Sequence, residues 1–159
     1  MTVLTRLLII FVLILGLAGC TSIPPTNDTS ANACPLTEPL WIKPPIDAAV
    51  LDSPTFGFYF VNQDSSILAS ALWADPEETY LRAGGEGVKV GWFRPAGVPL
   101  KITGQRLDGQ APPFEAQVPC CYPTRFQATG LYFPTEGCWE VTAKAADSEL
   151  SFVVWVKPE

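Results

Sequence analysis

The sequence contains no histidine among its 159 residues. A Ser-His-Asp triad and a Cys-His catalytic pair both use an imidazole as the general base, so neither can be built within this chain. Zinc and copper sites with imidazole ligands are excluded for the same reason. The missing histidine therefore removes several common hydrolase and metal-site chemistries.

Positive charge is also scarce. The chain has 10 lysines and arginines against 16 aspartates and glutamates, which gives a formal net charge of −6 at pH 7. An acidic chain does not favour binding to the phosphate backbone of a nucleic acid. It does not favour electrostatic attachment to anionic lipid either, so attachment to a membrane has to come from apolar groups. We expect no nucleic-acid partner.

The first long apolar run lies at residues 7–17, after a short segment with one positive side chain, Arg6. This run is shorter than the roughly 20 apolar residues that a transmembrane helix needs. Two small residues follow it and lead to Cys20. The arrangement resembles a bacterial lipoprotein signal, and the alternatives are a plain secretory signal or an anchor helix.

The resemblance implies cleavage before Cys20 and lipidation of Cys20. We therefore expect residues 1–19 to be a signal peptide. The mature protein would be extracytoplasmic and lipid-anchored to the bacterial cell membrane. Residues 20–33 are rich in Ser, Thr, Asn and Pro and have little to bury, which is typical of a flexible tether.

Residues 34–45 contain four prolines, a density that excludes a helix and a central strand. We expect an extended arm along the edge of a domain that covers residues 34–159, with Trp41 fixing the arm in place.

Period-two alternation and Gly/Pro turns characterise the rest of the chain. The clearest pattern is a hairpin of residues 139–145 and 150–156, in which each strand has one apolar face. Further strands are expected at residues 56–61, 67–74 (a strand or a short helix), 79–82, 88–93, 100–103 and 114–118. No stretch has a sustained 3.6-residue period, so we predict an all-β sandwich or barrel.

Residues 133–141, Phe-Pro-Thr-Glu-Gly-Cys-Trp-Glu-Val, resemble the turn and penultimate strand of bacterial immunoglobulin-like modules. Shorter motifs are similar to a group of bacterial lipoproteins: Cys-Pro-Leu-Thr at 34–37, Ala-Leu-Trp at 71–73, Arg-Leu-Asp at 106–108 and Pro-Pro at 112–113. The resemblance implies an immunoglobulin-like β-sandwich at the cell envelope and implies no activity.

Four cysteines follow Cys20, and an even number in an exported chain predicts two disulfides. Cys138 enters the clearest strand and Cys34 begins the proline-rich arm, so we expect a Cys34–Cys138 bond. Cys120 and Cys121 would then bond to each other. Bonds joining Cys121 to Cys138 and Cys34 to Cys120 remain an alternative, and the adjacent pair is also a candidate redox switch or soft-metal site.

Two further groups are candidate sites. Asp75, Glu77 and Glu78 form an acidic cluster that could serve glycoside cleavage or bind calcium, although a solvated acidic turn is the simpler interpretation. Trp155 lies on the opposite face of its strand from Val154 and is the best candidate for an exposed aromatic that binds sugar or peptide.

We expect a binding or structural module without enzymatic activity, cofactor or resident metal. Its partners would be the membrane, through the lipid anchor, and an envelope protein or glycan. The alternatives are a carboxylate-based envelope hydrolase and a thiol-redox or metal-handling lipoprotein.

Overall fold

The computed structural model describes residues 34–44, 56–74, 81–85, 87–120 and 122–159. The expected signal peptide, the tether and the predicted lipidation site Cys20 lie outside these residues, as does the acidic cluster Asp75, Glu77 and Glu78. Among the described residues, no helix is long and apolar enough to cross a membrane.

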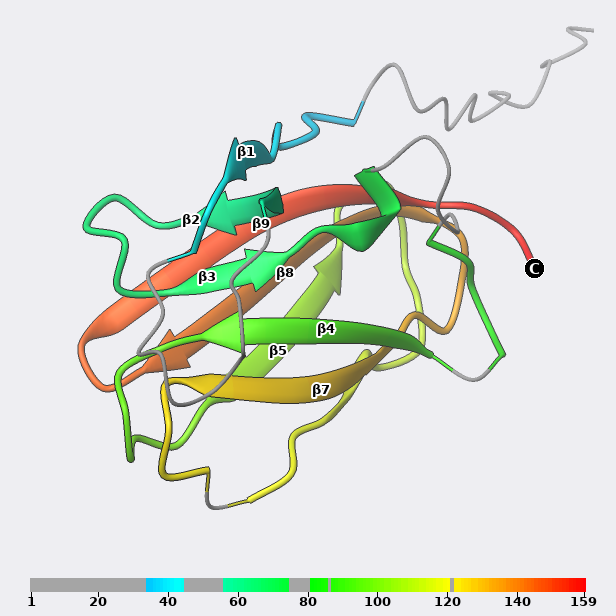
Figure 1. Cartoon of the computed structure of the whole chain (residues 1–159). Helices are drawn as coiled ribbons and strands as arrows, with labels where there is room; N and C mark the ends of the chain where they lie inside the picture. The colour runs from blue at the N-terminus through cyan, green and yellow to red at the C-terminus, as the bar shows by residue number, and fades with distance from the viewer. Residues whose placement is uncertain (1–33, 45–55, 75–80, 86, 121) are drawn as a thin grey trace, which may run out of the picture.

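Two antiparallel sheets pack against each other as a β-sandwich (Figure 1). The larger sheet has the strand order β1-β2-β3-β4-β7-β6 and the smaller has the order β5-β8-β9. Their bounds are β1 Leu40–Ile42, β2 Gly57–Val61, β3 Leu68–Ser70, β4 Val88–Phe93, β5 Lys101–Arg106, β6 Glu115–Gln117, β7 Phe126–Tyr132, β8 Gly137–Ala145 and β9 Ser148–Val156. One 3₁₀ turn, η3 (Leu72–Ala74), follows β3. The predicted all-β sandwich is confirmed.

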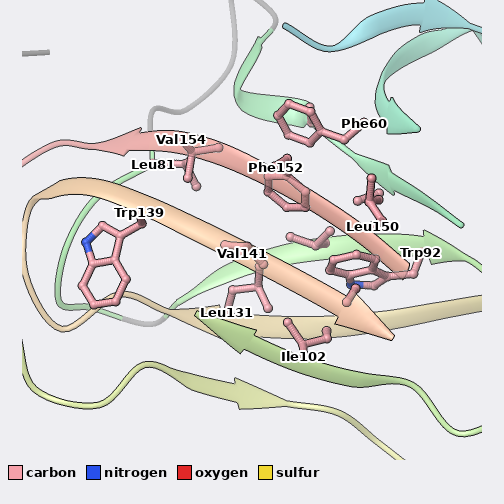
Figure 2. Close-up of a cluster of buried hydrophobic side chains, with 14 of the residues drawn as sticks. Phe60, Leu81, Trp92, Ile102, Leu131, Trp139, Val141, Leu150, Phe152 and Val154 are labelled. Atoms are coloured by element: carbon pink, nitrogen blue, oxygen red, sulfur yellow. The ribbon is translucent and has the colours of Figure 1, made fainter. Parts of the chain in front are cut away.

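The β8–β9 hairpin forms most of the smaller sheet, as predicted. Its nine residue pairs run from Gly137↔Val156 to Ala145↔Ser148. The two-residue turn places Ala146 at a φ of 52°, a left-handed conformation that tight hairpin turns use because it matches the twist of the strands. Val141 and Phe152 are buried on the inner face, where Figure 2 shows them between the two sheets.

The larger sheet buries the alternating face of β4 that the sequence predicted. Val90 and Trp92 have no exposed surface, and they pack against the inner face of the smaller sheet. Residues 67–74 were predicted as a strand or a short helix. The segment forms one of each, the strand β3 followed by the 3₁₀ turn η3. Of the predicted strand at 79–82, Arg82 makes a parallel bridge with Lys157, and residues 79 and 80 lie outside the described residues.

Strand β7 was absent from the predicted set, and that omission was wrong. Its inward-facing positions are Gln127, Thr129 and Leu131, all buried, so two of the three are polar and the apolar alternation is interrupted. Thr129 is accommodated because its Oγ1 accepts a 2.9 Å hydrogen bond from the Trp92 indole N–H. A buried hydroxyl with a partner costs far less than one without.

The proline-rich segment is an extended arm, as expected, and ends in the short edge strand β1. Trp41, which was expected to fix the arm in place, is 57% exposed, and its ring contacts the rings of Phe56 and Phe58, the second of which packs against the core. The end of the arm is held by the pairing of β1 with β2, and its start is held by a disulfide and a pair of hydrogen bonds.

Candidate functional site

The Cys34–Cys138 disulfide fastens the start of the described arm to β8, across 104 positions of sequence. This confirms the predicted pairing and excludes the alternative bond between Cys121 and Cys138. Cys120 is also disulfide-bonded, and Cys121, its predicted partner, lies outside the described residues. The predicted bond between the adjacent cysteines stays a prediction.

The arm also pairs with the outer edge of β9. The Thr37 N–H donates to the Val153 carbonyl at 3.0 Å, and the Val153 N–H donates to Thr37 Oγ1 at 2.9 Å. Just past the end of β9, four residues after Val153, the Lys157 N–H donates to the Leu81 carbonyl and the Lys157 carbonyl accepts from the Ala83 N–H, both at 2.8 Å. Different segments therefore cover this edge at two points, one within β9 and one just beyond its end.

Trp155 lies midway between these two covered points. Backbone groups of a strand alternate in direction, so the N–H and C=O of Trp155 face the same edge as those of Val153 and Lys157. A groove of about 260 Å³ lies against this edge, between the arm and the sandwich. The side chains of Phe60, Trp73 and Leu81, among others, line it.

This groove combines two features that suit a chain in extended conformation. First, the backbone of Trp155 faces the strand edge between Val153 and Lys157, whose backbone groups are already hydrogen-bonded. Second, the aromatic and aliphatic lining can receive an apolar side chain. Addition of an extended segment to a sheet edge uses the same two features, backbone pairing for affinity and a side-chain pocket for specificity. The sequence predicted Trp155 as a binding residue from its outward position on the strand. In the structure its side chain is half-buried and forms part of the groove wall. Its binding role stays a prediction.

Sequence reasoning did not connect the other walls of the groove to Trp155. Phe60 and Trp73 lie about 80 to 95 positions before Trp155, and no local pattern joins the three. They meet because β2 and η3 lie across the open edge of the sandwich from β9, with the Phe60 ring 6.1 Å from that of Trp73.

A second and larger pocket, of about 520 Å³, lies where the segment after β4 meets the segment between β6 and β7. Its lining includes Arg94, of which only 1% is exposed. Arg94 Nε donates to Gln127 Oε1 at 2.7 Å, and its other two nitrogens donate to the carbonyls of Pro95 at 2.7 Å and Tyr122 at 3.1 Å. Gln127 is fixed in turn by a 2.7 Å hydrogen bond to the Pro119 carbonyl.

Arg94 is a buried cation whose hydrogen-bond partners are all neutral. The two ion pairs of the described residues join Arg106 to Asp108 and Lys144 to Glu149, and neither includes Arg94. Burial lowers the pKa of the Arg94 guanidinium below its ordinary value, because desolvation disfavours the charged form. Residue 94 continues the inward alternation of Val90 and Trp92, and this pattern in the sequence indicates its burial.

Asp108 supports the start of β8. Its Oδ1 lies 2.6 Å from Arg106 Nε, and its Oδ2 accepts a 3.0 Å hydrogen bond from the Cys138 N–H. Burial acts to raise the pKa of Asp108, but these hydrogen bonds and the charge of Arg106 outweigh it and lower the pKa. Gly137 has a φ of 126°, and a Cβ there would come within 2.8 Å of both side chains.

The described residues include no group of three or more His, Cys, Asp or Glu side chains that could hold a metal ion. The candidate hydrolase carboxylates are outside the described part of the chain, so the candidate features within it are the groove at Trp155 and the pocket at Arg94. No protein-family model, curated protein or solved structure matches this chain.

Proposed function

We propose that this protein is an extracytoplasmic lipoprotein, anchored in the bacterial cell membrane through Cys20, whose immunoglobulin-like β-sandwich is a binding module. Its partner is an extended segment of an envelope protein, which adds to the edge of β9 at Trp155. The observation that carries this proposal is the groove at Trp155, bounded on both sides by covered positions of the same strand edge.

The disulfide chemistry supports the compartment. Structural disulfides persist in oxidising environments outside the cytoplasm and are rare in reducing ones. Cys34 and Cys138 join distant parts of the chain, and the bond holds the arm that forms one wall of the groove. The acidic net charge supports an acyl anchor over electrostatic attachment, because the chain would be repelled by anionic lipid.

The groove itself supports an extended peptide as partner. Only one residue separates Trp155 from each covered position, Val153 and Lys157. The backbone of the partner therefore pairs with β9 only around Trp155. Specificity then comes from one apolar side chain of the partner, which enters the groove between Phe60, Trp73 and Leu81. The lining also includes the acidic residue Glu38.

Site-specific photo-crosslinking in intact cells tests this proposal. A photoreactive amino acid replaces Trp155, and the matched control carries it at Lys101, an exposed residue of β5 on the opposite edge of the same sheet. We expect a protein adduct of discrete mass from position 155 and none from position 101. The absence of an adduct at 155, or equal adducts at both positions, would contradict the proposal. An adduct that disappears on digestion with a glycan hydrolase would contradict a protein partner and assign a glycan instead.

A further inference from the structure

Three large apolar side chains are exposed together at one margin of the larger sheet. They are Leu40 and Trp41 of the edge strand β1 and Phe56, which directly precedes β2, and they are 55%, 57% and 58% exposed. The Trp41 ring stacks beside that of Phe56, with centroids 6.4 Å apart and planes inclined by 18°. We call these three side chains the β1 patch. Apolar side chains exposed together mark a contact with a partner or a membrane.

The patch is exposed because the larger sheet is wider than the smaller one. Phe60 of β2 stacks on Phe152 of β9, so β1, one strand further out at the margin of the larger sheet, extends past β9 (Figure 1). Trp41 pairs with Phe58, whose side chain packs against the core, and thus continues the inner face of the sheet outward. Leu40 lies on the opposite face of the strand. The apolar surface therefore wraps around the edge.

The backbone of this edge is poorly suited to pairing with a further strand. The Phe58 carbonyl accepts from the Ala71 N–H, so Phe58 faces β3 and its neighbours in β2 face β1. By the same alternation Trp41 presents its N–H and C=O at the open edge, and Pro39 and Lys43 occupy the flanking positions. Proline has no N–H to donate, and an edge lysine repels the same lysine of a second copy. The patch therefore offers apolar side chains without a favourable backbone edge.

The stretch of chain between the proposed anchor and the patch is short. Residues 20–33 can span at most about 50 Å, even when fully extended. They lead to Cys34, which the disulfide fixes to β8, and Trp41 follows seven positions later. A tether of this length makes contact between the patch and the bilayer intramolecular, with an effective concentration on the order of millimolar. A patch too small to bind a membrane by itself is then sufficient.

We propose that the β1 patch docks on the bilayer that holds Cys20, so that the sandwich lies against the membrane with β1 at the level of the headgroups. This inference rests on the proposed lipid anchor. Aromatic side chains are favoured at this depth, where water still satisfies the open backbone groups of Trp41. The Lys43 ammonium, which disfavours a second copy of the chain, is attracted by lipid phosphates. The acidic chain has no general attraction to anionic lipid, so apolar contacts have to provide the docking.

Quenching of tryptophan fluorescence by brominated lipid tests the docking. The mature lipidated chain is reconstituted in phosphatidylcholine vesicles that carry bromine near the headgroup end of the acyl chains. Flotation of the vesicles reports the anchor, and quenching reports the docking. We expect the wild type to float and to lose about one fifth of its fluorescence relative to vesicles without bromine, because Trp41 is one of five tryptophans and lies at the interface.

Two variants locate the contact. Trp41→Phe combined with Lys101→Trp keeps the number of tryptophans and moves one to an exposed position on β5, at the edge of the smaller sheet away from β9. Phe56→Asp keeps Trp41 as the reporter and places a carboxylate in the patch. We expect both variants to float like the wild type and to lose most of the quenching.

The outcomes separate the docking from the anchor. A wild-type chain that floats without quenching would overturn the docking and leave the anchor intact, whereas one that does not float would contradict the anchor and the docking together. Wild-type quenching in either variant would show that the β1 patch is not the face in contact. An unquenched Trp41 that acrylamide cannot reach would assign the patch to a second copy of the chain instead of lipid.

Discussion

The rings of Phe60 and Phe152 stack face to face, with centroids 4.1 Å apart and planes inclined by 7°. Phe60 belongs to β2 of the larger sheet and Phe152 to β9 of the smaller, so this contact joins the two layers directly. Both side chains are almost fully buried, at 3% and 1% exposure. Trp92 adds a third ring from β4, 6.2 Å from Phe152.

Replacing Phe152 with alanine should therefore lower the free energy of unfolding by about 3–5 kcal/mol, because it leaves a cavity between the sheets. Denaturant unfolding followed by tryptophan fluorescence measures this. The control is Ser151→Ala, one residue earlier on the exposed face, for which we expect a change within about 0.5 kcal/mol. A loss below about 1 kcal/mol in the phenylalanine variant would contradict the packing described here.

Removing the disulfide should release the arm without unfolding the sandwich. The double variant Cys34→Ala with Cys138→Ala leaves no free thiol from this pair, and a bridge that closes a loop of 104 residues contributes up to about 4 kcal/mol. We expect a loss of about 2–4 kcal/mol. Hydrogen exchange should show that protection of the Val153 amide falls, since its acceptor Thr37 is on the arm. Unchanged stability and protection would show that the arm is held without the bond.

The stability contributed by Asp108 should depend on pH. Its pKa in the folded protein is lowered by the hydrogen bonds from Arg106 and Cys138, which outweigh the opposing effect of burial. The contribution is therefore present above the unfolded-state pKa of about 3.9 and is lost as pH falls through the lower folded-state value. The stability difference between wild type and Asp108→Asn should be largest near neutral pH and shrink below about pH 4. A constant difference between pH 7 and pH 2 would contradict this role.

The hairpin of β8 and β9 was predictable because both strands alternate cleanly and a short polar turn joins them. The Cys34–Cys138 bond was predictable because a proline-rich arm without much apolar area needs another attachment to the sandwich. The alternation of the hairpin is a local feature, whereas the disulfide joins residues 104 positions apart, and the sequence also allowed Cys121 as the partner of Cys138. The inward face of β4 follows from a local pattern as well, since Val90 and Trp92 repeat every second residue.

Strand β7 and the complete lining of the two candidate sites could not be found in this way. Gln127 and Thr129 occupy inward positions because Arg94 and Trp92 on the neighbouring strand give them hydrogen-bond partners, and local sequence does not contain that information. The groove at Trp155 likewise depends on a contact between β9, η3 and the arm. Polar residues at buried positions are interpretable only once the neighbouring strand is known.

The central claim is that a lipid anchor at Cys20 holds this sandwich on the extracytoplasmic face of the membrane. Metabolic labelling with a palmitate analogue tests it most directly, by comparing the wild-type chain with Cys20→Ser in bacterial cells. We expect label on the wild-type protein in the membrane fraction and none on the variant. An unlabelled wild-type protein, cleaved at another residue and released in soluble form, would contradict the claim.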